Sequence, residues 1–277
     1  MRIGVFAKVF VRPTLADGFD AVRGAGLDTV QFNMSCAGLP TLPEAIEASR
    51  ADEIAALARD RGITLAAVSG TFNMIHPDRG ERRAGLARLG VLLAACRRLG
   101  VPLVTLCTGS RDPSDMWRRH ADNDRPEAWR DLVESLNEAL WMAAEHGVTL
   151  GVEPEVSNVI DSAVKCRRLL DELGSPYLKA VLDGANLFHA GELPRMRDIL
   201  DEACDLLAGD IALAHAKDLA RDGEAGDRAA GTGVLDYKHY LAGLRRARYD
   251  GPLILHGLNE TEVAASVAFL KKVDGRL

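Results

Sequence analysis

The sequence predicts an α/β protein in which eight parallel strands and eight helices alternate to form a (β/α)8 barrel. Two observations support this prediction. A unit of helix, glycine and short apolar segment recurs along the chain, and eight such apolar segments are present. Eight strand–helix units in about 250 residues is the usual size of this barrel. No linker or shift in composition interrupts the repeat, so residues 1–277 are expected to form a single domain.

Short, continuous apolar runs are interpreted as the strands, because both faces of a parallel sheet are buried in such a fold. In chain order the predicted strands are Arg2–Phe6, Thr29–Phe32, Thr64–Ser69, Leu103–Thr108, Thr149–Glu153, Lys179–Asp183, Ile211–His215 and Leu253–His256. A doubly wound open sheet is the alternative, but the first strand-to-helix turn lacks its glycine-rich phosphate-binding fingerprint.

The segments between these strands have helical spacing. One series of apolar residues steps by three and four positions and consists of Leu86, Leu89, Leu93 and Cys96. The last helix is expected at about Thr261–Lys272. A glycine that ends a helix adopts the left-handed conformation without steric cost. Glycines at such positions are Gly26, Gly62, Gly100 and Gly147.

The composition excludes several classes of protein. The net charge is −6, and no cluster of Lys and Arg with interleaved aromatic residues is present, so a nucleic-acid partner is not expected. No apolar stretch approaches the length of about 20 residues that a membrane span requires. The N-terminus lacks the features of a signal peptide, and the five cysteines form no C-x-x-C pair. These features favour a cytoplasmic protein with reduced cysteines.

Polar residues stand at the carboxyl ends of the predicted strands, where barrels of this kind have their active sites. Four consecutive strands end in Glu153, Asp183, His215 and His256. Two carboxylates and two imidazoles would be costly to bury there without partners. One divalent metal ion would satisfy all four, with Mn²⁺ the first choice and Mg²⁺, Co²⁺, Fe²⁺ or Zn²⁺ as alternatives. The other interpretation is a set of salt bridges and helix caps.

Further polar residues follow other strands and are candidates for substrate binding. The third strand leads to Asn73 and His76, and the fourth leads to Arg111. His76 could instead belong to a helix-entry loop, and Arg111 could be a solvated loop residue or a ligand for a phosphate or carboxylate. Lys217 follows the seventh strand and could contact the substrate or only pair with a carboxylate at the rim.

Several short motifs in the second half of the chain occur in a fixed order. They are Glu153 with Asn158, then Asp183-x-x-Asn186-Leu187, then His215-x-Lys217-Asp218, and then Gly231-x-Gly233-x-x-Asp236-Tyr237. In this order and spacing the chain resembles the sugar phosphate isomerase/epimerase family of the xylose isomerase-like TIM barrel superfamily. That family includes ketose 3-epimerases, hydroxypyruvate isomerases and inosose dehydratases. The resemblance extends over nearly the whole chain and is strongest from Thr149 to Glu260.

The resemblance implies a set of roles. Glu153, Asp183 and His215 correspond to three metal ligands, Asn186 is expected to contact the substrate, and a homo-oligomer (dimer or tetramer) is expected. Many family members end the eighth strand with a second Glu, which binds metal and exchanges a proton. His256 stands there instead, and a metal-bound imidazole has no spare base. The second proton carrier is therefore expected among Glu260, His76 and Lys217.

These observations lead to one functional hypothesis with two alternatives. The chain is expected to be a metal-dependent isomerase or epimerase of a keto sugar, cyclitol or related polyol, and so an enzyme of carbohydrate metabolism. The metal would chelate the carbonyl and an adjacent hydroxyl oxygen, and Glu153 would move a proton through an enediolate. A metal-dependent lyase or dehydratase acting on a keto sugar or inosose is the first alternative. A barrel that binds a sugar without turnover is the second.

Overall fold

A computed structural model describes residues 1–277 and has the (β/α)8 barrel that the sequence predicts. Its eight parallel strands are β1 (Arg2–Phe6), β2 (Thr29–Phe32), β3 (Thr64–Ser69), β4 (Leu103–Cys107), β5 (Thr149–Glu153), β6 (Leu178–Asp183), β7 (Ile211–Asp218) and β9 (Pro252–Leu255). Each strand pairs with its neighbour in the chain, and β9 also pairs with β1, so the sheet closes on itself.

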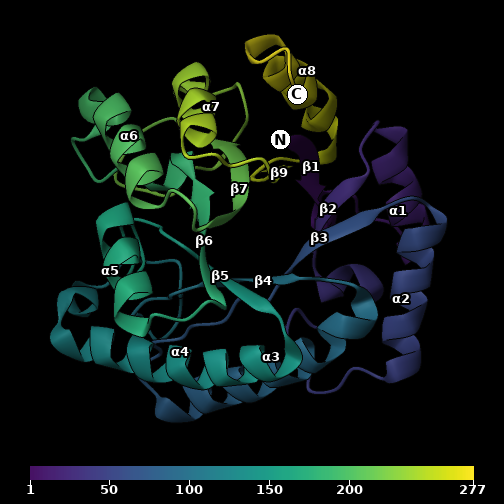
Figure 1. The fold of residues 1–277 in the computed structure, drawn as a ribbon, viewed down its shortest axis with the longest axis horizontal. Helices are drawn as coiled ribbons and strands as arrows, with labels where there is room; N and C mark the ends of the chain where they lie inside the picture. Colours follow the sequence, from purple (N-terminus) through teal and green to yellow (C-terminus); the bar gives the residue numbers. More distant parts are fainter.

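Eight helices form a ring around these strands (Figure 1). They are α1 (Leu15–Gly24), α2 (Ala48–Asp60), α3 (Arg79–Leu99), α4 (Pro126–His146), α5 (Ala163–Leu173), α6 (Met196–Leu206), α7 (Tyr237–Arg246) and α8 (Glu260–Val273). Short 3-10 helices are η1 (Ala7–Val9), η2 (Met34–Ala37), η3 (Ala121–Asp124), η4 (Gly184–Asn186) and η5 (Leu193–Arg195). Gly100 and Gly147 end α3 and α4 with φ of 70° and 65°, as predicted.

The seventh strand is longer than predicted, because it continues beyond His215 to Asp218. Its extension pairs in antiparallel fashion with β8 (Arg228–Ala229), a two-residue strand that the apolar pattern did not indicate. This pairing keeps Lys217 in regular strand geometry at the mouth of the barrel.

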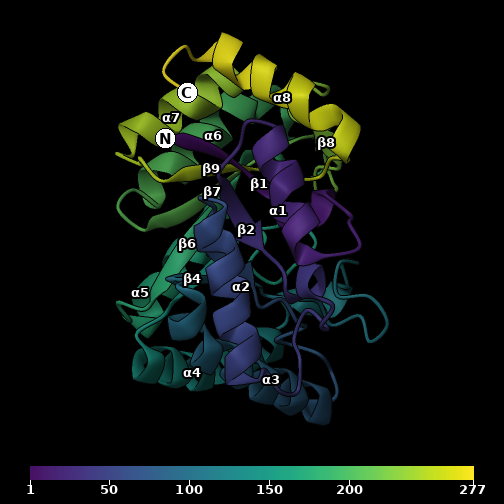
Figure 2. The ribbon, with the colours of Figure 1, turned by 90° about the vertical axis from the view of Figure 1, so that its right-hand side faces the viewer.

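The two ends of the chain lie close together where the barrel closes. Parallel pairing of β1 with β9 aligns Ile3 with Leu253. Figures 1 and 2 both show the N-terminus and the C-terminus beside one another, next to α8. None of the helices is long and apolar enough to cross a membrane.

The inside of the barrel is arranged in layers, because side chains two residues apart on a strand point to the same face. An apolar layer fills the centre and consists of Ala67, Leu103, Val181, Leu213 and Ile254. Two residues further along the same strands are Ser69, Thr105, Asp183, His215 and His256. Phe6, Gln31 and Glu153 complete this second set from β1, β2 and β5. We call these eight residues the mouth layer.

A glycine allows the apolar layer to close beneath Glu153. Gly151 lies two residues before Glu153 on β5 and is buried inside the barrel. A Cβ atom at this position would lie 2.8 Å from Cγ2 of Val181 and 3.2 Å from Cδ1 of Leu103. The missing side chain therefore lets these two neighbours seal the barrel below the polar groups.

Candidate metal and substrate site

A cavity of about 670 Å³ occupies the mouth of the barrel. Seven residues of the mouth layer line it, namely Phe6, Gln31, Ser69, Thr105, Glu153, His215 and His256. Residues beyond the strand ends form its walls and include Lys8, Met116, Trp117, Glu155, Asn186 and Asp227. This size is within the range of about 300–1,000 Å³ that is typical of small-molecule sites.

Three potential metal ligands converge at the floor of this cavity. Glu153, Asp183 and His215 each offer one ligand atom, and these atoms all lie within 4.8 Å of one another. The Nδ1 atom of His215 is 3.3 Å from Oε1 of Glu153 and 3.7 Å from Oδ2 of Asp183. They come from the ends of three consecutive strands, β5, β6 and β7.

The chemistry of these groups fits a divalent cation. Asp183 is fully buried, and its Oδ2 atom accepts no hydrogen bond. Its nearest cation is Lys217, whose Nζ atom lies 3.4 Å away. Burial raises the pKa of Asp183, because a carboxylate loses its hydration there. A bound cation would compensate this buried oxygen, and two carboxylates with one imidazole are suitable ligands for Mn²⁺, Fe²⁺, Co²⁺ or Zn²⁺.

Glu153 is held in its ionised form. Burial opposes its ionisation, but the positive charges of His215 and Lys217 outweigh that effect and lower its pKa to about 2. Its Oε1 atom faces His215 and accepts a hydrogen bond of 2.7 Å from Nδ2 of Asn186. No protein group donates to Oε2, so one carboxylate oxygen is engaged and the other is free.

Gln31 orients the imidazole of His215. The Nε2 atom of Gln31 donates to the hydroxyl oxygens of Ser69 and Thr105, each at 3.2 Å. The amide oxygen must then face His215, whose Nε2 atom lies 2.8 Å from it. An amide oxygen only accepts, so Nε2 of His215 carries a proton in either state of the ring. In the metal-free protein the nearby carboxylates favour the charged imidazolium, and loss of the second proton would make Nδ1 available to a metal.

His256 lies beside the three ligands but is not part of their cluster. Its ring stacks on His215 and on Phe6, with centroid distances of 4.9 Å and an interplanar angle of 18° in both cases. Burial and the neighbouring charge of His215 lower its pKa well below the usual value, so the imidazole is neutral. Its Nδ1 atom is buried without a hydrogen-bond partner.

Lys217 and Asn186 both line the cavity, as expected for groups that contact a substrate. Lys217 is almost fully buried, and the carboxylates of Asp183 and Glu153 outweigh this burial and raise its pKa. It therefore supplies a fixed positive charge at the floor. The Oδ1 atom of Asn186 accepts from the backbone N–H of Gly226, which leaves its amide group directed at Glu153.

The structure places four other candidates outside the cavity wall. Glu260 is at the surface, where both carboxylate oxygens accept hydrogen bonds from Arg12. Asn73 bridges the loops after β3 and β4 through the backbone of Ser110. His76 contacts the carbonyl of Pro113 in the same region.

Arg111 is engaged in the same loop region. Its guanidinium donates to the carbonyl of Ile75 and to Oδ2 of Asp131. Asp131 belongs to α4, so Arg111 joins that helix to the loops after β3 and β4.

Glu155 and Trp117 line the cavity but were not among the site residues predicted from the sequence. Glu155 is buried in the wall, its carboxyl group has no hydrogen bond, and burial followed by the charge of Glu153 raises its pKa to about 8. Trp117 stands in the long loop after β4. Glu155 lies only two residues beyond Glu153, and counting in twos past the strand end would have indicated it.

Comparisons with known proteins agree with this architecture. Residues 19–273 match the family model described as "Xylose isomerase-like TIM barrel". A sequence search of curated proteins gave no significant match.

Solved structures of similar fold cover nearly the whole chain. The apo form of 3-keto-D-glucoside 4-epimerase, YcjR, from E. coli has 18% sequence identity and a TM-score of 0.75 over 98% of this chain and 99% of that one. D-psicose 3-epimerase in the presence of D-fructose has 16% identity and a TM-score of 0.74 over 99% and 100%. The IOLI protein with a bound zinc atom has 16% identity and a TM-score of 0.76 over 100% and 99%. With the match to the family model, the chain belongs to the xylose isomerase-like TIM barrel family.

Proposed function

We propose that this protein is a divalent-metal-dependent isomerase or epimerase that acts on a keto sugar or a related polyol. The observation that carries the proposal is the convergence of Glu153, Asp183 and His215 at the floor of a cavity large enough for a sugar. Related folds that act on sugars, among them the psicose and keto-glucoside epimerases, support the same class of reaction.

A bound divalent cation would polarise the substrate carbonyl and so lower the pKa of the neighbouring C–H group. Glu153, Asp183 and His215 would hold it. His215 is already oriented for this role by Gln31, and Asp183 lacks any other strong partner for its buried oxygen. Mn²⁺ is the first ion to test, because mixed oxygen and nitrogen ligation suits it.

Glu153 is the group proposed to take the proton from carbon. Its Oε1 atom faces His215, while Oε2 has no protein partner and is free to act as a base. A carboxylate with a low pKa is ionised at neutral pH, which a general base requires. Lys217 adds a buried positive charge that would stabilise the negative oxygen formed when the proton leaves.

Epimerisation also needs a group that returns a proton to the opposite face of the carbon. Glu155 lines the same cavity and has no hydrogen bond to the protein, whereas Glu260 is paired with Arg12 at the surface. We therefore assign the second proton carrier to Glu155 rather than to Glu260. The stacked, neutral His256 would shape the site beside His215 without carrying a proton.

A second candidate is a lyase that removes a group from the carbon next to the site of proton abstraction. His256, rather than a carboxylate, follows the last barrel strand, and this favours elimination because that reaction does not need a symmetric pair of bases. Product mass separates the two reactions. Isomerisation leaves the mass unchanged, whereas elimination lowers the mass by that of water or of the leaving group.

The direct test is exchange of substrate hydrogen with deuterated water, followed by NMR over a panel of keto sugars with Mn²⁺-loaded protein and with protein stripped by a chelator. We expect metal-dependent deuterium incorporation, lost in Glu153→Gln. Glu155→Gln should retain exchange at carbon but lose formation of the epimer. Absence of exchange with every keto sugar, in protein that binds the metal, would contradict the proposal.

A further inference from the structure

Trp117 differs from Trp129 because its ring has no aromatic or cationic stacking partner in the chain. It lines the cavity, is 51% exposed, and forms a hydrogen bond only through its backbone N–H, to Asp115. By contrast, Trp129 donates its indole N–H to Glu172 and has Arg168 stacked 3.9 Å from its ring centroid. Trp117 therefore presents an open aromatic surface to whatever occupies the cavity.

The loop that carries Trp117 is fixed on both sides of this residue. Before it, the carbonyl of Met116 accepts a hydrogen bond from Asn158, which is fully buried. After it, the carbonyl of Arg118 accepts from the hydroxyl of Ser110. An aromatic side chain on a fixed backbone loses little entropy when a ligand packs on it.

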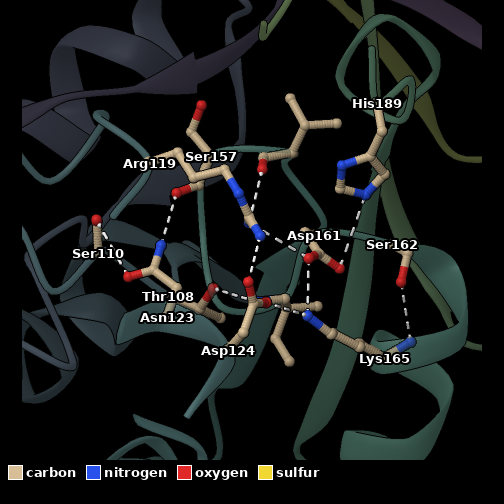
Figure 3. Close-up of polar contacts among 12 residues, drawn as sticks. Thr108, Ser110, Arg119, Asn123, Asp124, Ser157, Asp161, Ser162, Lys165 and His189 are labelled. Atoms are coloured by element: carbon tan, nitrogen blue, oxygen red, sulfur yellow. Dashed lines mark hydrogen bonds and ion pairs between the residues drawn. The ribbon is translucent and has the colours of Figure 1, made fainter. Parts of the chain in front are cut away.

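A charged cluster anchors the same loop to the barrel (Figure 3). Arg119 bonds to Asp124 and lies 3.5 Å from Asp161, a buried carboxylate. Asp161 also receives a hydrogen bond of 2.7 Å from Lys165 on α5, and His189 lies 4.0 Å from it on another side. This cluster links the loops after β4, β5 and β6, so it holds the position of Trp117 relative to the metal ligands.

The cavity extends beyond the space above the metal ligands. Its volume is about 670 Å³, and Trp117 forms part of its wall. A volume of this order accommodates drug-sized molecules rather than only a small monosaccharide. The site therefore has room for a second ring between the floor and the rim.

The charges of the wall do not suit an anionic substrate. The acidic residues that line the cavity are Glu153, Glu155, Glu224 and Asp227, whereas the basic ones are Lys8 and Lys217, and no arginine is among them. Lys217 is already paired with Asp183. Sites for phosphates or carboxylates usually supply arginine forks or helix N-termini.

We propose that the substrate is an uncharged keto sugar that carries a second ring, and that this outer ring packs against Trp117. The inner sugar would lie over Glu153 and His215, and the outer ring would occupy the rim. The proposal rests on the proposed function, because it assumes that the inner keto sugar binds at the metal ligands.

The test is calorimetric titration of the Mn²⁺-loaded protein with matched probes. D-Fructose supplies the inner ring alone, and fructose 6-phosphate adds an anion. Lactulose, turanose and palatinose carry a second ring on different oxygens of the same ketohexose. We expect at least one disaccharide to bind about tenfold more tightly than fructose, which is the scale of one aromatic packing contact, and fructose 6-phosphate to bind no more tightly than fructose.

Variants assign the effect to the tryptophan. Trp117→Ala should reduce the affinity for that disaccharide to the affinity for fructose and leave fructose binding unchanged, and Trp117→Phe should retain the preference. Trp141→Ala is the matched control, because Trp141 is 69% exposed on α4 and lies outside the cavity wall. Ligand-induced change in tryptophan fluorescence should disappear in Trp117→Ala and persist in Trp141→Ala.

Three results would overturn the proposal: equal affinity for fructose and all three disaccharides, tighter binding of fructose 6-phosphate, or an unchanged disaccharide preference in Trp117→Ala. Failure of the proposed function is a separate result, since it would appear as no bound Mn²⁺ by elemental analysis or no deuterium exchange. Repeating the titrations on chelator-treated protein measures whether the preference for a disaccharide over fructose persists without the metal.

Discussion

Asp183 at the mouth of the barrel and Asp210 at the opposite end are both carboxylates beside a lysine, but their surroundings differ. Asp183 is fully buried, its Oδ2 atom accepts no hydrogen bond, and Lys217 is 3.4 Å away. Asp210 precedes β7 and accepts hydrogen bonds of 2.5 Å from Lys179 and 2.7 Å from Arg167. Burial raises the pKa of Asp183, whereas the two cations outweigh a smaller burial effect and lower the pKa of Asp210.

The comparison indicates that the two ends of the barrel have separate tasks. At the end where the strands begin, charges are matched and contribute to stability. At the mouth, the buried Oδ2 atom of Asp183 accepts no hydrogen bond, which destabilises the metal-free protein. The same oxygen is then available to a bound cation. Substitutions at the two ends should therefore have opposite effects on stability and activity.

The largest effect is expected from Asp183→Asn. It removes a buried carboxylate oxygen that has no hydrogen bond, while Glu153 remains as a negative charge near Lys217. The metal-free protein should therefore melt at the same temperature or a higher one. Loss of one metal ligand should lower turnover by a factor of about 10³ or more and abolish stoichiometric Mn²⁺ binding. Elemental analysis, thermal melting with a chelator and deuterium exchange measure the three effects. A clear drop in metal-free melting temperature would contradict the assignment of Asp183 to function.

Gln31→Leu should have the next largest effect. The change removes the acceptor that holds the proton on Nε2 of His215. Gln31 itself is not one of the proposed metal ligands. Loss of such a partner typically lowers metal affinity by about 10- to 100-fold. Competition with a chelator measures this affinity, and Thr105→Val, which removes only one of the two hydroxyls that hold Gln31, is the milder control. Unchanged affinity in Gln31→Leu would show that the imidazole is oriented by other contacts.

Asp210→Asn tests the opposite end. It should lower stability by about 1–3 kcal/mol at neutral pH, the scale of a hydrogen bond to a charged group, and leave metal binding and turnover unchanged. The lowered pKa of Asp210 means that its stabilisation is present above the usual value of 3.8 and is lost as the pH falls through the folded-state pKa. Denaturant unfolding at several pH values should therefore show a difference from the parent that shrinks in acid. A constant difference down to acid pH would exclude the ion pairs as its cause.

Glu260→Gln should have the smallest effect. The carboxylate forms an exposed pair with Arg12, which lowers its pKa, and lies outside the cavity wall. Turnover should remain within about twofold of the parent, since exposed ion pairs contribute little and no substrate contact is lost. A loss comparable to that of Glu153→Gln would return Glu260 to the list of proton carriers.

The sequence was sufficient to predict the barrel, and three of the four metal ligands that it suggested meet at the floor, whereas His256 lies beside them. Alternation of apolar segments with helices identified eight strands, and the structure contains all eight of these parallel strands. Glu153, Asp183 and His215 converge because parallel strands end at the same rim, which is a property of the fold rather than of the loops. Residues that follow the strand period were thus accessible from sequence.

Loop residues were not accessible in the same way. Asn73, His76 and Arg111 are polar residues near strand ends, but they bond to neighbouring loops instead of lining the cavity. Trp117 lies ten residues beyond the end of β4, and its position depends on hydrogen bonds from Ser110 and Asn158 that no periodicity encodes. Tertiary contacts position the side chains of loops, and these contacts cannot be read from the pattern of a single sequence.

The anchored loop around Trp117 has a consequence for the rate of turnover. Many barrel enzymes complete their active site by closing a lid over the substrate, and this motion often limits kcat. Here the outer wall is assembled before any substrate arrives, because residues 110–119 are held by Asn158, by Ser110 and by the Asp161 cluster. If no lid closes, we expect turnover to be insensitive to solvent viscosity at this step, and hydrogen exchange should show slow exchange of the loop amides in the free protein. Substrate selection would then depend on the fit of the substrate to a preformed cavity, without a conformational change of this loop.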